Sequence, residues 1–236
     1  MNPPAGWADA HNHLHLCAAA DRAGYPCVVN ATREDDWPDA LAAAATATAS
    51  FAALGIHPWH ADAVVDGWLP RLRAMLETDA TISIGECGLD SKTDRCPLDA
   101  QIPVFREQLR LAVEMNRPVT IHCVGAWGEL VGALEAQAVP PRALIHSFNG
   151  SVEMAARLAG LGACFSISGR ALQPSGAKAI RAFQTLAAER ILLETDAPNA
   201  PGNLAEIGTE VAARLGFSPP AFAALTHRNF LRLFQP

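Results

Sequence analysis

Histidines and carboxylates occur at the ends of short apolar runs that lie far apart along this chain. The runs read WADAHNHLH, ISIGECGLD, VTIHC, ALIHSF and ILLETDAP. The chemically useful residues that they carry are His11, His13, Glu86, His122, His146 and Asp196. Imidazole and carboxylate groups are ligands for divalent metal ions. If the fold gathers these side chains, the chemistry that they predict is metal-dependent hydrolysis.

The pair His11 and His13 has the spacing of two ligands on one strand. Residues i and i+2 of an extended strand point to the same side, so both imidazoles can reach one cation. The alternative is a pair of ordinary surface histidines. Asp9 lies on the same face, and we expect it to orient the two rings by hydrogen bonding.

Glu86 and Asp196 are the predicted catalytic carboxylates. The two oxygens of Glu86 could each bind one cation, and the glycines on either side of it, Gly85 and Gly88, predict close approach of other backbone. The alternative for Glu86 is a helix-cap or turn carboxylate. Asp196, where the last apolar run meets a proline-rich loop, could bind metal and accept a proton from water. Glu194 on the same strand is either a support for the ligands or a buried structural acid.

The predicted ligand set exceeds the needs of one structural zinc ion, which is usually closed by four ligands. Four histidines and two carboxylates suit two divalent ions with open positions, where water can be converted to hydroxide near neutral pH. Zn, Mg and Mn are the candidate ions. His57, at the end of the third run, is predicted to bind substrate or act as an acid.

Eight apolar runs can be counted as strands, and segments with helical spacing separate most of them. The runs cover residues 9–13, 27–32, 48–58, 81–86, 118–123, 142–148, 164–169 and 190–198, with the fourth ending at Glu86. The clearest helix is expected over 98–116. Strand–helix alternation predicts an α/β fold, and eight strands favour a (β/α)8 barrel, which gathers its strand ends at one face. One domain over residues 1–236 is predicted.

Composition excludes several classes of protein. No apolar run approaches the roughly 18 residues of a membrane span, and no basic-then-apolar leader precedes the first strand, so a cytoplasmic location is expected. The formal net charge of −6 and the lack of a basic run disfavour tight, extended DNA binding. The six cysteines form no CxxC pair. GxSxG, P-loop and GxGxxG motifs are absent, and nothing indicates an obligate protein partner.

A series of motifs, in order along the chain, resembles the TatD family of metal-dependent deoxyribonucleases within the amidohydrolase-like barrel superfamily. They are DAHNH (9–13), GIHP (55–58), IGECGLD (84–90), QIPVFREQLRLA (101–112), RPVTIHC (117–123), HSFNGS (146–151), LLETDAP (192–198) and NFLRLF (229–234). The resemblance implies a distorted TIM-type (β/α)8 barrel with divalent metals. It implies that His11 and His13 bind one metal with Asp196, that His122 and His146 bind the other, and that Glu86 bridges them.

The family resemblance also implies phosphodiester hydrolysis, with 3′→5′ trimming of single-stranded DNA in some members. Two departures bear on the substrate. The run after His122 reads CVGAW and lacks the arginine that members often carry there, and the segment after Asp90 is short and without tyrosine. Lys92 and Arg170 are the candidate substitutes as phosphate contacts.

The leading prediction is therefore a metal-dependent phosphodiesterase or deoxyribonuclease that acts on single-stranded DNA ends or small phosphoesters. The first alternative is an amidohydrolase-type enzyme that cleaves C–N or C–O bonds of a small metabolite, because the same hydroxide can attack a carbonyl. A lysine at the end of the fourth strand would favour that alternative, and Glu86 is there instead. The second alternative is a non-catalytic metal-binding protein.

Overall fold

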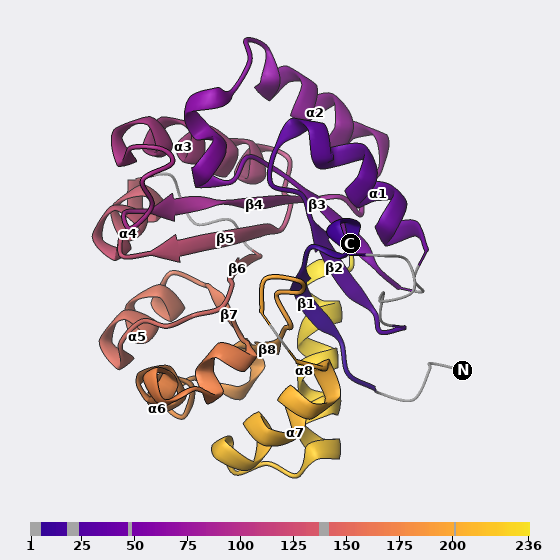
Figure 1. Cartoon of the computed structure of the whole chain (residues 1–236), viewed down its shortest axis with the longest axis vertical. Helices are drawn as coiled ribbons and strands as arrows, with labels where there is room; N and C mark the ends of the chain where they lie inside the picture. Colours follow the sequence, from indigo (N-terminus) through magenta and orange to yellow (C-terminus); the bar gives the residue numbers. More distant parts are fainter. Residues whose placement is uncertain (1–5, 18–23, 47–48, 137–141, 201) are drawn as a thin grey trace.

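Eight parallel strands follow one another around the centre of the molecule in the order of the sequence (Figure 1). The structure is a computed structural model that describes residues 6–17, 24–46, 49–136, 142–200 and 202–236. The strands are β1 (Asp9–Asn12), β2 (Cys27–Asn30), β3 (Phe51–Leu54), β4 (Ser83–Asp90), β5 (Val119–Val124), β6 (Ala143–Ile145), β7 (Cys164–Ile167) and β8 (Ile191–Leu193). Nearly all strand residues are buried, as in a parallel sheet that is covered on both faces.

Helices follow the strands and surround the sheet on its outer side (Figure 1). They are α1 (Trp37–Ala45), α2 (Trp68–Thr78), α3 (Leu98–Glu114), α4 (Trp127–Ala136), α5 (Val152–Gly160), α6 (Ala177–Phe183), α7 (Leu204–Leu215) and α8 (Pro219–Phe234). The predicted (β/α)8 barrel is confirmed. Among the described helices, none has the length and apolarity that crossing a membrane requires.

The barrel closes where β1 meets the segment that follows β8. The backbone N–H of Asp196 donates to the carbonyl of His11 at 3.0 Å, and the N–H of His13 donates to the carbonyl of Ala197 at 2.7 Å. The carboxylate of Asp9 accepts hydrogen bonds from the Thr195 hydroxyl at 2.6 Å and the Thr195 N–H at 3.0 Å. These bonds hold the first and last predicted ligands of the chain in one place.

Glu86 is not the last residue of its strand, and the prediction that the fourth strand ends there is wrong. β4 continues to Asp90, so Glu86 lies in its middle. β5 runs beside this extension, with Gly88 opposite His122 and Asp90 opposite Val124. The extension depends on Gly88, because a Cβ atom there would lie 2.0 Å from the carbonyl oxygen of His122. The third strand also ends earlier than expected, three residues before His57.

Gln101 of α3 holds the end of β4 and the segment after it. Its buried side chain accepts a hydrogen bond from the Asp90 N–H at 2.7 Å. It donates to the carbonyl oxygens of Asp90 at 2.9 Å and Cys96 at 2.8 Å. One amide therefore satisfies three backbone groups at the end of β4 and in the segment after it.

Replacement of Gln101 by alanine is expected to lower the free energy of unfolding by about 2–4 kcal/mol, because it leaves buried backbone groups unpaired. Urea unfolding followed by circular dichroism measures this change. Gln184→Ala is the matched control, since Gln184 is exposed and its side chain makes one hydrogen bond among the described residues, to the Arg214 carbonyl. Its effect should stay within about 0.5 kcal/mol. Equal losses in the two variants would contradict the role given to Gln101.

Candidate metal centre

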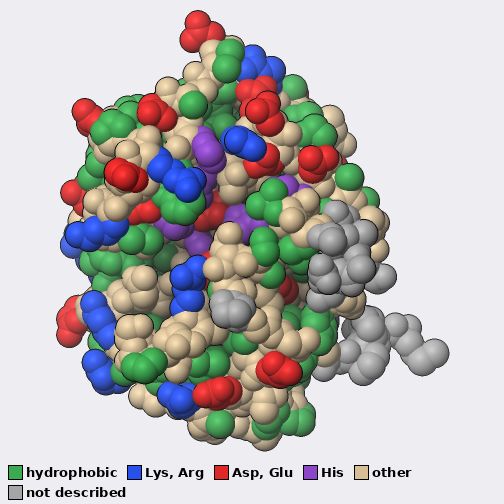
Figure 2. Space-filling view, in the orientation of Figure 1, with side chains coloured by type: hydrophobic (Ala, Val, Ile, Leu, Met, Phe, Trp, Pro, Cys, Tyr) green, Lys and Arg blue, Asp and Glu red, His purple; other side chains and the backbone are tan. Residues whose placement is uncertain are grey.

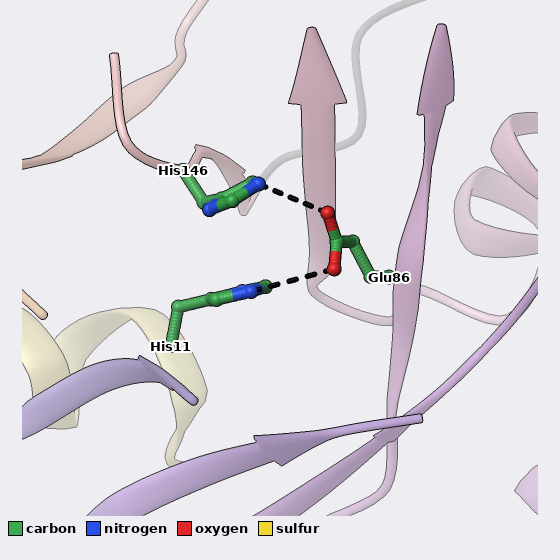
Figure 3. Close-up of side chains that lie close together, drawn as sticks. All are labelled: His11, Glu86 and His146. Carbon is green, nitrogen blue, oxygen red and sulfur yellow. Dashed lines mark ion pairs between the residues drawn. The ribbon is translucent and has the colours of Figure 1, made fainter. Parts of the chain in front are cut away.

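The two carboxylate oxygens of Glu86 face two different groups of histidines. Oε1 lies 2.9 Å from His122 Nδ1, 2.9 Å from His146 Nε2 and 3.3 Å from His57 Nε2. Oε2 lies 3.3 Å from His13 Nε2 and 3.4 Å from His11 Nε2. Figure 3 shows His146 and His11 directed at opposite oxygens of Glu86. Each oxygen of this carboxylate thus faces its own group of imidazole nitrogens.

Asp196 completes the group that contains His11 and His13. Its Oδ1 lies 3.7 Å from His13 Nε2 and 3.9 Å from His11 Nε2. The buried residues Glu194 and Thr195 separate Asp196 from the end of β8. The φ of Asp196 is +57°, in the left-handed region. The structure thus brings together all six predicted ligands, and His57, which the sequence predicts as a substrate-binding or acid residue, lies beside them.

The spacing of the donor atoms fits bound divalent cations. Ligands about 2.0–2.1 Å from one tetrahedral ion lie about 3.4 Å from each other. The two Nε2 atoms of His11 and His13 are 3.3 Å apart, and His122 Nδ1 is 3.2 Å from His146 Nε2. Among the described residues, three sets have donor atoms that lie within 4.8 Å of one another inside each set: His11 with Glu86 and His146, His11 with His13 and Asp196, and His57 with Glu86 and His122.

The buried carboxylates of the centre also favour a bound positive charge. Burial opposes ionisation of Glu86, yet the imidazoles of His57, His146 and His11 hold the pKa of its carboxyl well below the usual range. Burial likewise opposes protonation of His146, yet Glu86 and Glu194 raise its pKa well above the usual value. Buried carboxylates here need a compensating cation, and a metal ion can take the place of the histidine protons.

His57 differs from the other histidines, because burial lowers its pKa to about 4 despite the neighbouring Glu86. A neutral imidazole is the form that binds a metal. The interpretation of His57 as a substrate-binding or acid residue remains a prediction. Its position beside Glu86 makes it equally able to act as a ligand.

Several buried polar groups support the imidazoles from behind. The Asn30 carbonyl lies 2.7 Å from His13 Nδ1, and Glu194 Oε1 lies 3.5 Å from His146 Nδ1.

Asp9 was expected to orient the rings of His11 and His13, and the structure gives it other contacts. Its carboxylate accepts hydrogen bonds from Thr195 and from the His11 backbone N–H at 3.3 Å. Burial raises the pKa of Asp9 to about 7. Asp9 therefore fixes the strand that carries the ligands.

Asp90 is a site residue to which the sequence reasoning gave no role. Its Oδ2 accepts a hydrogen bond from the Trp59 indole N–H at 2.8 Å and lies 3.6 Å from His122 Nε2. Burial alone would raise the pKa of the Asp90 carboxyl, but its contacts with His122 and Trp59 lower that pKa. The alternation of side chains along a strand could have identified Asp90, since Glu86 and Asp90 are four residues apart and share a face of β4.

A cavity of about 700 Å³ opens over the centre, and its lining includes His13, His57, Glu86, His122, His146 and Asp196. Figure 2 shows the histidine side chains together near the middle of this face, with acidic side chains between them and basic side chains around them. Arg170 lines the cavity, and its Nη2 lies 3.4 Å from Asp196 Oδ2 and 3.0 Å from the Asn199 carbonyl. Lys92 is not among the lining residues, and its backbone N–H donates to Asp90 Oδ1 at 2.9 Å.

The sequence and the fold are similar to those of known hydrolases. The family described as TatD related DNase matches residues 8–235. The 3'-5' ssDNA/RNA exonuclease TatD of Cronobacter sakazakii is 31% identical over 95% of this chain and 92% of that protein. The uncharacterized metal-dependent hydrolase YjjV of Escherichia coli is 32% identical over 75% of this chain and 69% of that protein. The crystal structure of YjjV from Escherichia coli superposes with a TM-score of 0.89 over 98% of both chains, at 27% identity.

Proposed function

Because this chain belongs to the TatD family of metal-dependent hydrolases, we propose that it hydrolyses phosphodiester bonds at the 3′ ends of single-stranded DNA. The name of the relative from Cronobacter sakazakii supports a nucleic-acid substrate. The cavity of about 700 Å³ is large enough for a nucleotide, since small-molecule sites usually measure about 300–1,000 Å³.

One observation carries the proposal: the two oxygens of Glu86 face separate histidine groups at 2.9–3.4 Å. We propose that this carboxylate bridges two divalent ions, with Zn, Mg or Mn as the candidates. His11, His13 and Asp196 would hold one ion, and His122 and His146 the other. When bound, such ions lower the pKa of water and neutralise the charge on a phosphodiester.

The residues of the chain then have distinct tasks. Glu86 and the four histidines would fix the positions of the ions; Glu86, His11, His13 and His146 are buried, and His122 is partly buried. Asp196 has one oxygen toward His13 and the other toward Arg170, so the oxygen that faces the centre can accept the proton of the attacking water. Arg170 lines the cavity next to that carboxylate and is placed to contact a substrate phosphate.

The experiment that tests this proposal uses a 5′-labelled single-stranded oligonucleotide and protein loaded with Zn, Mg or Mn in turn. We expect progressive shortening from the 3′ end, and about 10²–10³-fold slower shortening by Asp196→Asn, the loss typical of one preorganised catalytic group. Asp99→Asn, an exposed change on α3, should leave the rate unchanged.

Failure to shorten the oligonucleotide with any of the three metals would refute the proposed substrate. Turnover of simple amides or lactones by the same samples would then support an amidohydrolase.

Three further expectations stay predictions from the sequence: a role for Lys92 in substrate binding, a cytoplasmic location and independence from any obligate protein partner.

A further inference from the structure

Arg95 lines the cavity and is not one of the residues of the candidate metal centre. Its guanidinium carbon lies 4.3 Å from the centre of the Trp59 ring, and both residues line the cavity. The side chain of Arg95 is exposed. Within the described parts of the chain, no carboxylate pairs with its guanidinium and no hydrogen bond uses it. The other arginine of the cavity, Arg170, is already bonded to Asp196 and Asn199.

Trp59 fixes Arg95 beside the candidate metal centre. The indole N–H is bonded to Asp90 Oδ2 at 2.8 Å. The centre of the indole lies 4.8 Å from that of the His57 ring and 6.5 Å from that of the His122 ring. Both imidazoles contact Glu86. The indole of Trp59 is therefore held at its N–H end beside the metal centre, and the face of the ring stacks on the Arg95 guanidinium.

A guanidinium stacked on an aromatic ring keeps its N–H donors available. Cation–π stacking uses the face of the guanidinium plane, whereas its five N–H groups point outward in that plane. This planar fork matches the oxygens of a phosphate. Since the lining of the cavity carries the carboxylates of Glu86, Asp90 and Asp196, an anionic substrate needs positive charge at the rim as well as at the centre.

We propose that Arg95, held on Trp59, binds a second phosphate of the substrate, adjacent to the phosphate that is hydrolysed. This inference rests on the proposed function and adds a specificity-determining residue to it. A polynucleotide end offers such a second phosphate, and a simple phosphodiester does not. The Arg95–Trp59 stack would thus make the enzyme discriminate in favour of polynucleotides.

The test combines oligonucleotide binding and hydrolysis in the same metal-loaded samples. Fluorescence anisotropy measures the affinity for a labelled single-stranded oligonucleotide, and hydrolysis is followed on that oligonucleotide and on bis(p-nitrophenyl) phosphate, which has one phosphate. Arg95→Gln is expected to weaken oligonucleotide binding about tenfold or more, as loss of a charge-assisted contact does. Its loss of kcat/KM should be larger for the oligonucleotide than for the one-phosphate substrate.

Salt dependence separates a phosphate contact from a structural role. For single strands, each phosphate neutralised by the protein contributes about 0.7 to the slope of log affinity against log salt concentration. Arg95→Gln should reduce that slope by about this amount. Arg181→Gln, an exposed change on α6 outside the cavity, removes the same charge and should leave both affinity and slope as in the wild type.

The inference is overturned if Arg95→Gln has the same oligonucleotide affinity and salt slope as Arg181→Gln. It is also overturned if Arg95→Gln loses equal fractions of kcat/KM on the oligonucleotide and on the one-phosphate substrate. Normal shortening of the oligonucleotide by that variant, without a change in affinity, refutes the role of Arg95 and leaves the proposed function intact. Arg95-dependent binding of an oligonucleotide that is never shortened has the opposite meaning. It supports the phosphate contact and refutes the nuclease activity.

Discussion

Glu86→Gln is expected to lower kcat by about 10³-fold and to leave the protein folded. An amide has one oxygen in place of the two that face the separate histidine groups, so it cannot serve both proposed ions as an anion. Removal of one preorganised electrostatic group typically costs about 10²–10³ in kcat, and Glu86 acts at both positions. Metal content per chain, measured by mass spectrometry after dialysis, should fall in parallel.

The matched control is Glu129→Gln, which removes an equal charge from the exposed start of α4. Its metal content and activity should equal those of the wild type. If Glu86→Gln keeps the full metal content and rate, then Glu86 bridges nothing and the proposed centre is wrong. Circular dichroism of both variants shows whether a loss of activity comes from a loss of fold.

Gly88→Ala is expected to destabilise the protein by more than about 4 kcal/mol, the range of severe backbone and packing defects. The added Cβ would lie 2.0 Å from the His122 carbonyl oxygen and 2.8 Å from the His122 backbone nitrogen. The backbone of Gly88 also has a φ of +145°, a conformation that residues with a side chain rarely adopt. Since the obstacle is backbone, β4 and β5 must separate, and the separation moves His122 away from Glu86.

Thermal unfolding measures this effect, together with the yield of folded protein. Gly132→Ala is the control, because Gly132 lies in α4 with nothing within 4 Å of the added Cβ position. Alanine in a helix interior should stabilise by about 0.5–1 kcal/mol relative to glycine. A Gly88→Ala protein that unfolds at the wild-type temperature would show that β4 and β5 are not packed as closely as described.

The sequence was sufficient to predict the barrel and the residues that gather at its centre. Apolar runs separated by helical spacing determine the order of strands, and the end of a parallel strand determines which side chains face the cavity. His146 and Asp196 follow β6 and β8 at the positions expected from this rule. Glu86 reaches the same place from the middle of a longer strand, because glycines allow β4 to continue beside β5.

Contacts between segments that are distant in sequence could not be predicted in the same way. Trp59 and Asp90 are 31 residues apart, and no pattern in either segment indicates that an indole N–H meets a carboxylate. The position of Arg95 over that indole depends on the path of the segment after β4, which Gln101 fixes. Propensity and periodicity describe single elements, whereas these contacts depend on how loops pack on the finished barrel.

The seam between β1 and the segment after β8 has a consequence for synthesis of the chain. His11 and His13 leave the ribosome before Asp196 and Ala197, to which their backbone groups are bonded. A nascent chain that stops short of these residues has an open barrel and an incomplete ligand set. Closure of the barrel and assembly of the proposed ligand set therefore depend on the same segment of the chain.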